Sequence, residues 1–489
     1  MRVLPSRVTG KRMLSNRNTK PALNRHGWLD KLPPLLRANP GALLLAVLLL
    51  LSAAVRLVGV SHPRSVVFDE VHFGGFATAY CCSREYFFDT HPPHAKLIIA
   101  GAARLLGYRG GPAFDRIGEP FGEISPLPLR LAPALAGTLL PLIIFGVLRQ
   151  LGAGRAAAFF GGLLLVFDNA LTIHARIIGL DSILLAATFG ALGLYLAAEK
   201  AATARRRALL SFLSGCAAGL AVGTKFTGLA IVGLIGWCLV VRIWRGKKRA
   251  GIAPTLRQAG WLLTGAALVY LIGWTLHFSL LNKPGPGNIW GAPTGKLTTD
   301  IVQIHGKMLS AHVNLKQRHP YGSPWWSWPL MKRPIYFWNS PSFSARMYSV
   351  GNPVVWWGGT LMFVVVLVNL MLARVTRFAL EPVGGLKRPR FWLPIVGFVA
   401  AYAPLVDVSR VLFMYHYFTP LVFSLLLVVL WLDYAGWTQG DDLLRQRASY
   451  YVVVAVLVLG FAILTPLTYG LETGKGITDT LFRIFPGWP

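Results

Sequence analysis

Residues 65–107 read SVVFDEVHFGGFATAYCCSREYFFDTHPPHAKLIIAGAARLLG, and this stretch holds two clusters of ionisable residues. Asp69 and Glu70 form the first cluster, directly after an apolar run that is long enough to cross a bilayer. Residues 89–96, DTHPPHAK, form the second cluster. Ionisable groups beside a membrane segment cost free energy and usually mark a functional site. The alternative reading is an ordinary solvated loop next to a first membrane helix.

Two prolines in the second cluster predict where the next helix begins. Proline fits the first turn of a helix but interrupts its interior. Pro92 and Pro93 therefore predict the start of an apolar-patterned helix that carries Lys96 and Arg104.

The composition is that of a membrane protein. The 489 residues are 54% hydrophobic and only 14% charged, with long runs that are almost free of charge. The formal net charge is +30, but Lys and Arg gather in short segments between apolar runs, which is typical of membrane topology rather than of nucleic-acid binding. The four cysteines make no disulfide framework. The adjacent pair Cys81-Cys82 is poorly placed for an ordinary disulfide, because neighbouring Cα atoms lie closer than disulfide geometry prefers.

Eleven apolar runs predict eleven membrane-spanning helices in an all-α polytopic fold. The predicted spans are residues 41–60, 129–148, 157–174, 178–198, 209–225, 227–244, 259–281, 353–373, 391–408, 411–432 and 450–469. With a basic tail of residues 1–38 in the cytoplasm, the short basic turns all fall on the cytoplasmic side. Residues 61–127 and 282–350 then form two long external loops within a membrane domain of residues 39–470, followed by an external tail of residues 471–489.

The second external loop contains a predicted helix over residues 300–315. Its apolar stripe consists of Ile301, Ile304, Met308 and Leu315, so we expect this helix to lie flat at the membrane interface. The aromatic run HPYGSPWWSWPL that follows is typical of interface anchoring.

No metal site is predicted. His305, His312 and His319 recur every seven residues, but two helical turns separate them by about 10 Å, too far to share one ion. No second acidic cluster resembling a metal cage accompanies Asp69 and Glu70.

The predicted topology brings ionisable residues from five segments to the external leaflet. They are Asp69 and Glu70 after the first span, Arg130 at the start of the second, His174, Arg176 and Asp181 between the third and fourth, Lys225 between the fifth and sixth, and Asp407, Arg410 and His416 between the ninth and tenth. Each has a structural alternative, such as a snorkelling arginine or a helix-capping aspartate. Five converging sets instead favour a polar cavity for an anionic, lipid-linked ligand, in which cations bind phosphate and a carboxylate handles a proton.

Seven motifs, in this order, resemble the protein O-mannosyltransferase family within the GT-C glycosyltransferases. They are FDEVHFGGFA, DTHPPHAKLIIA, LPLRLAPALAGT, HARIIGLDSILL, GTKFTGL, HPYGSPWWSWPL and SRVLFMYHYFTP. The resemblance covers roughly residues 41–435 and implies a fold of eleven membrane helices with an Asp-Glu pair in the first external loop. It also implies transfer of mannose from a polyprenyl (dolichyl) phosphate to Ser or Thr hydroxyls of secreted proteins.

The resemblance and the convergence together assign roles to individual residues. Asp69 matches the family's catalytic acidic position and Glu70 its neighbour, and Arg130, Arg176 and Lys225 are expected to bind the donor phosphate. The expected supporting residues are Asp89, His91, Asp181, Arg410 and His416.

Two features depart from the family pattern. Family members usually have an apolar residue where His94 stands. The second external loop is too short for the large β-trefoil insert that eukaryotic members carry, so the chain resembles the compact bacterial type.

The expected protein is an inverting glycosyltransferase of the plasma (inner) membrane, with its active site on the external, periplasmic face. Its expected partners are the polyprenyl-phosphate sugar donor, a protein acceptor and the bilayer; no nucleic acid, cofactor or metal is expected. A transferase acting on a glycolipid or lipid A is the first alternative. A transporter or flippase is the second, against which the long external loops and the absence of an internal repeat stand. The sequence specifies neither the sugar, the acceptor nor the oligomeric state.

Overall fold

The computed structural model describes residues 40–245, 251–314, 319–375, 389–408, 410–441 and 446–473, together with the single residues 443, 476, 480 and 488. The described residues from position 44 onward form one compact unit. The predicted cytoplasmic tail of residues 1–38 and most of the predicted C-terminal tail lie outside the described residues.

All eleven predicted spans are helical, which confirms the all-α polytopic fold. The helices are α2 (Pro40–Leu57), α5 (Leu127–Gln150), α6 (Arg155–Val166) with α7 (Asn169–Ala175), α8 (Asp181–Glu199), α9 (Ala204–Thr224), α10 (Leu229–Arg245), α11 (Ile252–Leu280), α13 (Gly359–Val375), α14 (Pro389–Val406), α15 (Phe418–Tyr434) and α16 (Ala448–Tyr469). Within the described ranges, nine helices are long and apolar enough to cross a bilayer, and α6 with α7 makes a tenth that is bent by 63°. The remaining one, α14, is apolar but shorter.

The bend between α6 and α7 has a polar cause. Asp168 lies between the two helices, and its carboxylate accepts a hydrogen bond from the backbone N–H of Leu171, which starts a new helix. The second oxygen of Asp168 accepts bonds from the backbone of Asn352 at 3.0 Å and from the indole of Trp356 at 2.9 Å. The third predicted span is therefore broken rather than continuous.

The first long loop (residues 61–127) contains three helices. Its helices are α3 (Glu70–Thr78), the π-helix η2 (Ala79–Ser83) and α4 (His94–Leu105). Pro93 is the N-terminal cap of α4, as the sequence predicts. Cys81 and Cys82 are joined by a disulfide within η2, contrary to the expectation from their adjacency.

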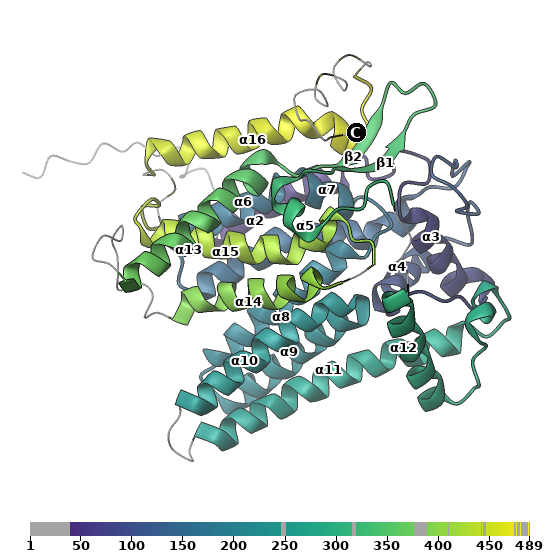
Figure 1. Ribbon diagram of the computed structural model, residues 1–489, viewed down its shortest axis with the longest axis horizontal. Coiled ribbons are helices and arrows are strands. Elements are labelled where there is room, and N and C mark those ends of the chain that lie inside the picture. Colours follow the sequence, from purple (N-terminus) through teal and green to yellow (C-terminus); the bar gives the residue numbers. More distant parts are fainter. Residues whose placement is uncertain are drawn as a thin grey trace, which may run out of the picture. The chain divides into compact units, whose positions relative to one another are not determined.

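The second long loop (residues 282–350) mixes helices with a hairpin. Its elements are η5 (Pro286–Trp290), α12 (Leu297–Asn314), η6 (Trp325–Leu330), β1 (Ile335–Asn339) and β2 (Arg346–Ser349). In Figure 1, α12 crosses α11. Ile304 and Met308 of the predicted apolar stripe pack against Trp274 of α11. Leu315 lies outside the described residues, and the interfacial position of the helix stays a prediction.

The antiparallel pair of β1 and β2 is the element that the sequence analysis missed. The run IYFWN in β1 is rich in the β-branched and aromatic residues that favour strands. Phe337 of β1 accepts a hydrogen bond at 3.1 Å from the backbone N–H of Phe68, and the two rings stack with centroids 4.3 Å apart. The hairpin therefore holds the turn that precedes Asp69.

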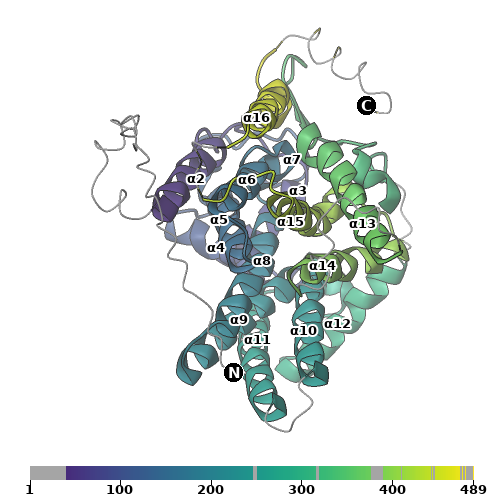
Figure 2. The same ribbon diagram turned by 90° about the vertical axis from the view of Figure 1, so that its left-hand side faces the viewer.

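Three of the spans lie next to one another. Figure 2 shows α9, α10 and α11 side by side beneath α8. Small residues permit this: a Cβ at Gly215 of α9 would lie 2.1 Å from the carbonyl oxygen of Leu262, and one at Gly265 of α11 would lie 2.2 Å from that of Phe212. The short connections here and farther along the chain are η3 (Phe226–Gly228), η7 (Val354–Gly358) and η9 (Met414–Tyr417).

Candidate active site

Asp69 lies in the turn directly before α3 and is the N-terminal cap of that helix. The preceding residue, Phe68, has φ of 44°, a left-handed conformation that costs energy outside glycine and often occurs at functional sites. The stacking of Phe68 on Phe337 holds this conformation. Asp69 is half-buried, and no described residue is hydrogen-bonded to its carboxylate.

The surroundings of Asp69 suit a general base. Burial raises its pKa to about 7; the charge of Lys225 works against this increase, and Asp181 and Asp89 add to it. A carboxylate with a pKa near neutral pH combines a useful ionised fraction with the ability to take a proton.

Glu70 has a different position from its neighbour. Its side chain is fully buried and accepts two hydrogen bonds from Arg130, at 2.7 and 2.8 Å. It also accepts the backbone N–H groups of Val67 and Ile178, both at 2.9 Å. Four bonds to one buried carboxylate leave it no free lone pair for a substrate proton.

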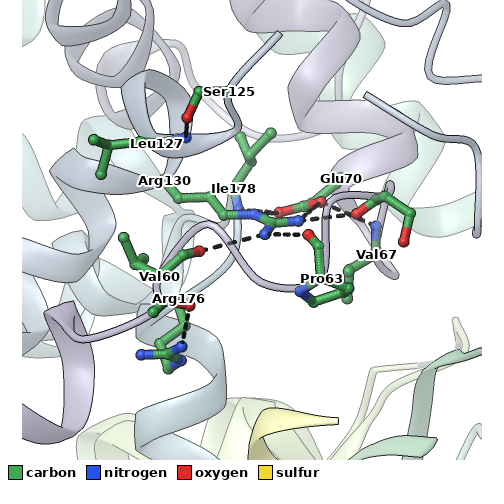
Figure 3. A network of polar contacts seen from close by, with 11 residues as sticks. Val60, Pro63, Val67, Glu70, Ser125, Leu127, Arg130, Arg176 and Ile178 are labelled. Carbon is green, nitrogen blue, oxygen red and sulfur yellow. Dashed lines mark hydrogen bonds and ion pairs between the residues drawn. The ribbon is translucent and has the colours of Figure 1, made fainter. Parts of the chain in front are cut away.

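Arg130 is fully engaged in the same network. Figure 3 shows its guanidinium enclosed by Glu70 and the backbone of the first long loop. Besides the two bonds to Glu70, it donates to the carbonyl oxygens of Val60, Pro63 and Ser65 at 3.4, 2.8 and 3.0 Å. These bonds use all five N–H groups of a side chain with no exposed surface. The geometry therefore does not fit the expected contact of Arg130 with a donor phosphate.

Arg176 is the C-terminal cap of α7, and its side chain reaches the end of α2. Its guanidinium donates to the carbonyl oxygens of Val58 and Gly59, both at 2.7 Å, and to that of Arg56 at 3.0 Å. It also lies 4.5 Å from the ring centroid of Tyr469. These contacts are typical of an arginine that donates to the carbonyl oxygens at the end of a helix. They do not fit the expected contact of Arg176 with a donor phosphate.

Lys225 lies in the polar site, at the C-terminal end of α9. Its ammonium donates to Asp181 Oδ1 at 2.7 Å and lies 5.0 Å from the ring centroid of Tyr415. Asp181 Oδ2 is 3.5 Å from Nδ1 of His174, whose ring packs on Tyr415 and Phe418. Asp181 thus orients Lys225 and is itself oriented by His174, a residue for which the sequence suggested only a location.

Lys96 organises the second cluster, residues 89–96. The Lys96 ammonium forms an ion pair with Asp89 and donates to the carbonyl oxygen of His91 at 2.7 Å. Burial opposes ionisation of Asp89, but the charge and hydrogen bond of Lys96, together with His91, outweigh this effect and lower the pKa of Asp89. Burial also lowers the pKa of His91 well below its usual value, so the imidazole is neutral at pH 7. Asp89 and His91 lie within electrostatic range of Asp69 and Lys225, respectively.

Arg410 brings a second cation to the site from the connection between α14 and α15. It interacts electrostatically with Tyr415, with Asp89 and with His416. None of the residues that the structure describes accepts a hydrogen bond from it. Arg410 also lines a groove of about 330 Å³, formed by residues 322–325, the end of α14 and residues 410–412.

His416 is part of the turn that presents Tyr415. Its Nδ1 lies 3.0 Å from the carbonyl oxygen of Phe413, and its ring stacks on Tyr415. Tyr415 in turn interacts electrostatically with Asp69 and Asp181. His416 therefore supports the wall of the site through Tyr415.

The expected site residues fall into two separate networks, and most of them belong to the network around Asp69. One surrounds Asp69 and contains Lys225, Asp181, Asp89, His91, Arg410 and His416. The other joins Glu70 to Arg130 inside the first long loop, with Arg176 at the end of α2. Within the described ranges, no group of three or more His, Cys, Asp or Glu side chains is placed to hold a metal ion, and the expectation of metal independence stays a prediction.

Comparisons with known proteins define the class first. The structure superposes on that of the S. cerevisiae protein O-mannosyltransferase Pmt1–Pmt2 complex bound to the sugar donor, with a TM-score of 0.82, 19% identity and coverage of 92% of this chain and 93% of that one. The archaeal oligosaccharyltransferase AglB from Archaeoglobus fulgidus gives a TM-score of 0.53 with 13% identity, over 92% of this chain and 58% of that one. The fold is that of a GT-C membrane protein.

Two family models then match successive parts of the chain. The model described as dolichyl-phosphate-mannose-protein mannosyltransferase matches residues 46–282, and the C-terminal four-transmembrane region of protein O-mannosyltransferase matches residues 297–486. The chain belongs to the protein O-mannosyltransferase family.

The curated relatives are longer proteins. Dolichyl-phosphate-mannose–protein mannosyltransferase 4 of S. cerevisiae is 33% identical over 258 residues, which cover 50% of this chain and 33% of the relative. Protein O-mannosyltransferase 1 of Drosophila melanogaster is 34% identical over 210 residues, covering 42% and 23%. The matched part spans a third or less of the length of these relatives.

Proposed function

We propose that this protein transfers mannose from a polyprenyl-phosphate donor to Ser or Thr hydroxyls of exported proteins, with inversion at the anomeric carbon. The observation that carries the proposal is the placement of Asp69, a carboxylate with a pKa near 7, in one site with the cations Lys225 and Arg410. The names of the family and of its curated relatives support the choice of donor and acceptor.

The proposed reaction is a single displacement. Asp69 accepts the proton of the acceptor hydroxyl while the hydroxyl oxygen forms a bond to the anomeric carbon of mannose. The bond from that carbon to the phosphate oxygen breaks on the opposite face, and the polyprenyl phosphate leaves with the electron pair. Cations near the leaving oxygen stabilise the charge that develops there.

Arg410 and Lys225 are the cations that we assign to the phosphate. Arg410 lines a groove and has its guanidinium N–H groups available with respect to the described residues. The ammonium of Lys225 uses one of its three donors on Asp181. Arg130 and Arg176 are assigned to the structure of the first long loop and of α2, because their donors already bind protein oxygens.

The proposal is tested with purified, detergent-solubilised protein. Polyprenyl-phosphate mannose is offered with a Ser/Thr peptide or with a glycolipid acceptor, and the anomeric configuration of the product is determined by NMR. Transfer to the peptide with the configuration opposite to that of the donor is expected. Transfer to the glycolipid alone would establish the alternative function, and retained configuration would exclude the single displacement.

We also propose that the site faces the outside of the plasma membrane. The short basic turns support this orientation through the positive-inside rule. A reporter fused after Arg207 is expected to read cytoplasmic, and one fused within residues 282–350 is expected to read external. A cytoplasmic signal from the second fusion would reverse the proposed orientation.

A further inference from the structure

We propose that His94 is a positioning residue whose imidazole locks α4 into a slot between α9 and α11 and thereby places the Asp89–Lys96 pair beside Asp69. The effect on transfer rests on the proposed function; the slot itself does not.

Two glycines form the slot. A Cβ added at Gly223 of α9 would lie 2.3 Å from Nδ1 of His94, and one at Gly273 of α11 would lie 2.3 Å from its Nε2. Neither glycine has a positive φ, so the backbone does not require glycine at either position. Glycine within a helix destabilises it relative to alanine. The close approach of the imidazole explains why glycine stands at both Gly223 and Gly273.

The imidazole is also held by direct contacts. It is 4% exposed, and its Nε2 lies 2.9 Å from the carbonyl oxygen of Val269 in α11, which requires the Nε2–H tautomer. Its ring is stacked on that of Tyr270, with centroids 5.6 Å apart. The hydroxyl of Tyr270 is 2.6 Å from Nε2 of His305 in α12. The slot therefore connects both long loops to α11.

The connection to the site runs through Lys96. Lys96 is two residues beyond His94 on α4 and is 1% exposed. It holds Asp89 by an ion pair and His91 through its carbonyl oxygen. A shift of the first turn of α4 would move Lys96, and Asp89 would follow because its ion-pair partner is Lys96.

That movement would change the pKa of Asp69. The charged and titratable groups that interact with Asp69 are Lys225 from the end of α9, Asp181 from α8, Asp89 from the second cluster and Tyr415 from η9. Asp89 is the one that depends on α4. Moving this carboxylate away removes a contribution that raises the pKa of Asp69, so the acid limb of the pH–rate profile shifts to lower pH.

The test uses three variants of the slot. His94→Leu keeps most of the volume but removes the donor to Val269, and we expect kcat to fall by about tenfold, with the donor KM within about twofold of wild type and the acid limb at lower pH. His94→Gln retains an N–H at the end of the side chain and is expected to recover part of the loss. Gly223→Ala fills the slot and should reproduce the effect of His94→Leu.

The reciprocal test separates the slot from general helix packing. In a His94→Ala background the slot is vacant, so Gly223→Ala should add no further loss. Gly219→Ala is the matched control, because its Cβ would lie 2.5 Å from the carbonyl oxygen of Ala266 and does not meet His94. This control should lower the unfolding temperature without moving the acid limb.

Amide hydrogen exchange tests the slot independently of transfer. Exchange in residues 84–105 should increase in His94→Leu and Gly223→Ala, and the increase should be absent from Gly219→Ala. A wild-type protein without transfer activity but with this pattern would contradict the proposed function alone. Wild-type kinetics and exchange in His94→Leu, or equal effects of Gly223→Ala in both backgrounds, would overturn the role of His94.

Discussion

Replacing Arg130 by alanine should destabilise the protein rather than weaken donor binding selectively. Arg130 and Glu70 are both fully buried and share two hydrogen bonds. The variant leaves the Glu70 carboxylate with only the N–H groups of Val67 and Ile178. It also leaves the carbonyl oxygens of Pro63 and Ser65 without the donors that Arg130 supplies to them.

The magnitude follows from this burial. Removing one partner of a buried ion pair costs about 3–5 kcal/mol, because the other charge stays buried without compensation. Glu70→Gln, which keeps the shape but removes the charge, should cost a comparable amount by leaving Arg130 unpaired. Since both changes break one pair, the double variant should be more stable than the sum of the single effects predicts, by about 0.5–3 kcal/mol.

Thermal unfolding in detergent, followed by tryptophan fluorescence, measures the loss of stability, and initial rates against donor concentration measure binding. We expect a lower unfolding temperature for Arg130→Ala, with kcat reduced and the donor KM little changed in the folded fraction. A variant with wild-type unfolding and a donor KM raised tenfold would refute the assignment and return Arg130 to the phosphate site.

The other predictions concern the network around Asp69. Asp69→Asn should reduce turnover by on the order of a hundredfold, because the amide cannot accept the proton, while the unfolding temperature stays near that of wild type; near-normal transfer would mean another base. Arg410→Ala and Lys225→Ala should each weaken donor use by about tenfold or more, since a charge-assisted hydrogen bond contributes about 1.5–3 kcal/mol. An unchanged donor KM in both variants would exclude them from the phosphate site. Transfer should decrease as the pH falls below about 7, because Asp69 becomes protonated there; a flat profile between pH 5 and 8 would contradict its role as base.

The sequence predicts those features of the fold that depend on local properties. Hydropathy and length are properties of a short window, and every predicted span is helical. Pro93 caps α4 because proline restricts its own backbone and that of its neighbour. Convergence around Asp69 also followed from topology, since helix ends on one side of a bilayer meet in one layer.

Features set by distant contacts were not predictable in this way. The bend at Asp168 depends on Asn352 and Trp356, which lie 184 and 188 residues farther along the chain. The conformation of the Asp69 turn depends on Phe337 in a hairpin with only four and five residues in its strands. Both involve partners that the local pattern does not identify.

The same sequence pattern, a cation at the end of an apolar helix, leads to different roles, which the hydrogen-bond donors separate. Arg130 has all five N–H groups bound to protein oxygens. Lys225 has one bond, to Asp181, and Arg410 has none to the described residues. A guanidinium binds phosphate through a free pair of donors, so exposure of donors, rather than charge, distinguishes a phosphate ligand from a structural arginine.

Ion pairing sorts the charges of the site in the same way. Asp181 is paired with Lys225, and Asp89 is paired with Lys96. Asp69 and Arg410 are then the two charged groups of this network without an ion-pair partner among the described residues. A single displacement needs one base for the incoming hydroxyl and one cation for the departing phosphate. The pairing leaves one group free for each task, which is why these two side chains carry the proposed mechanism.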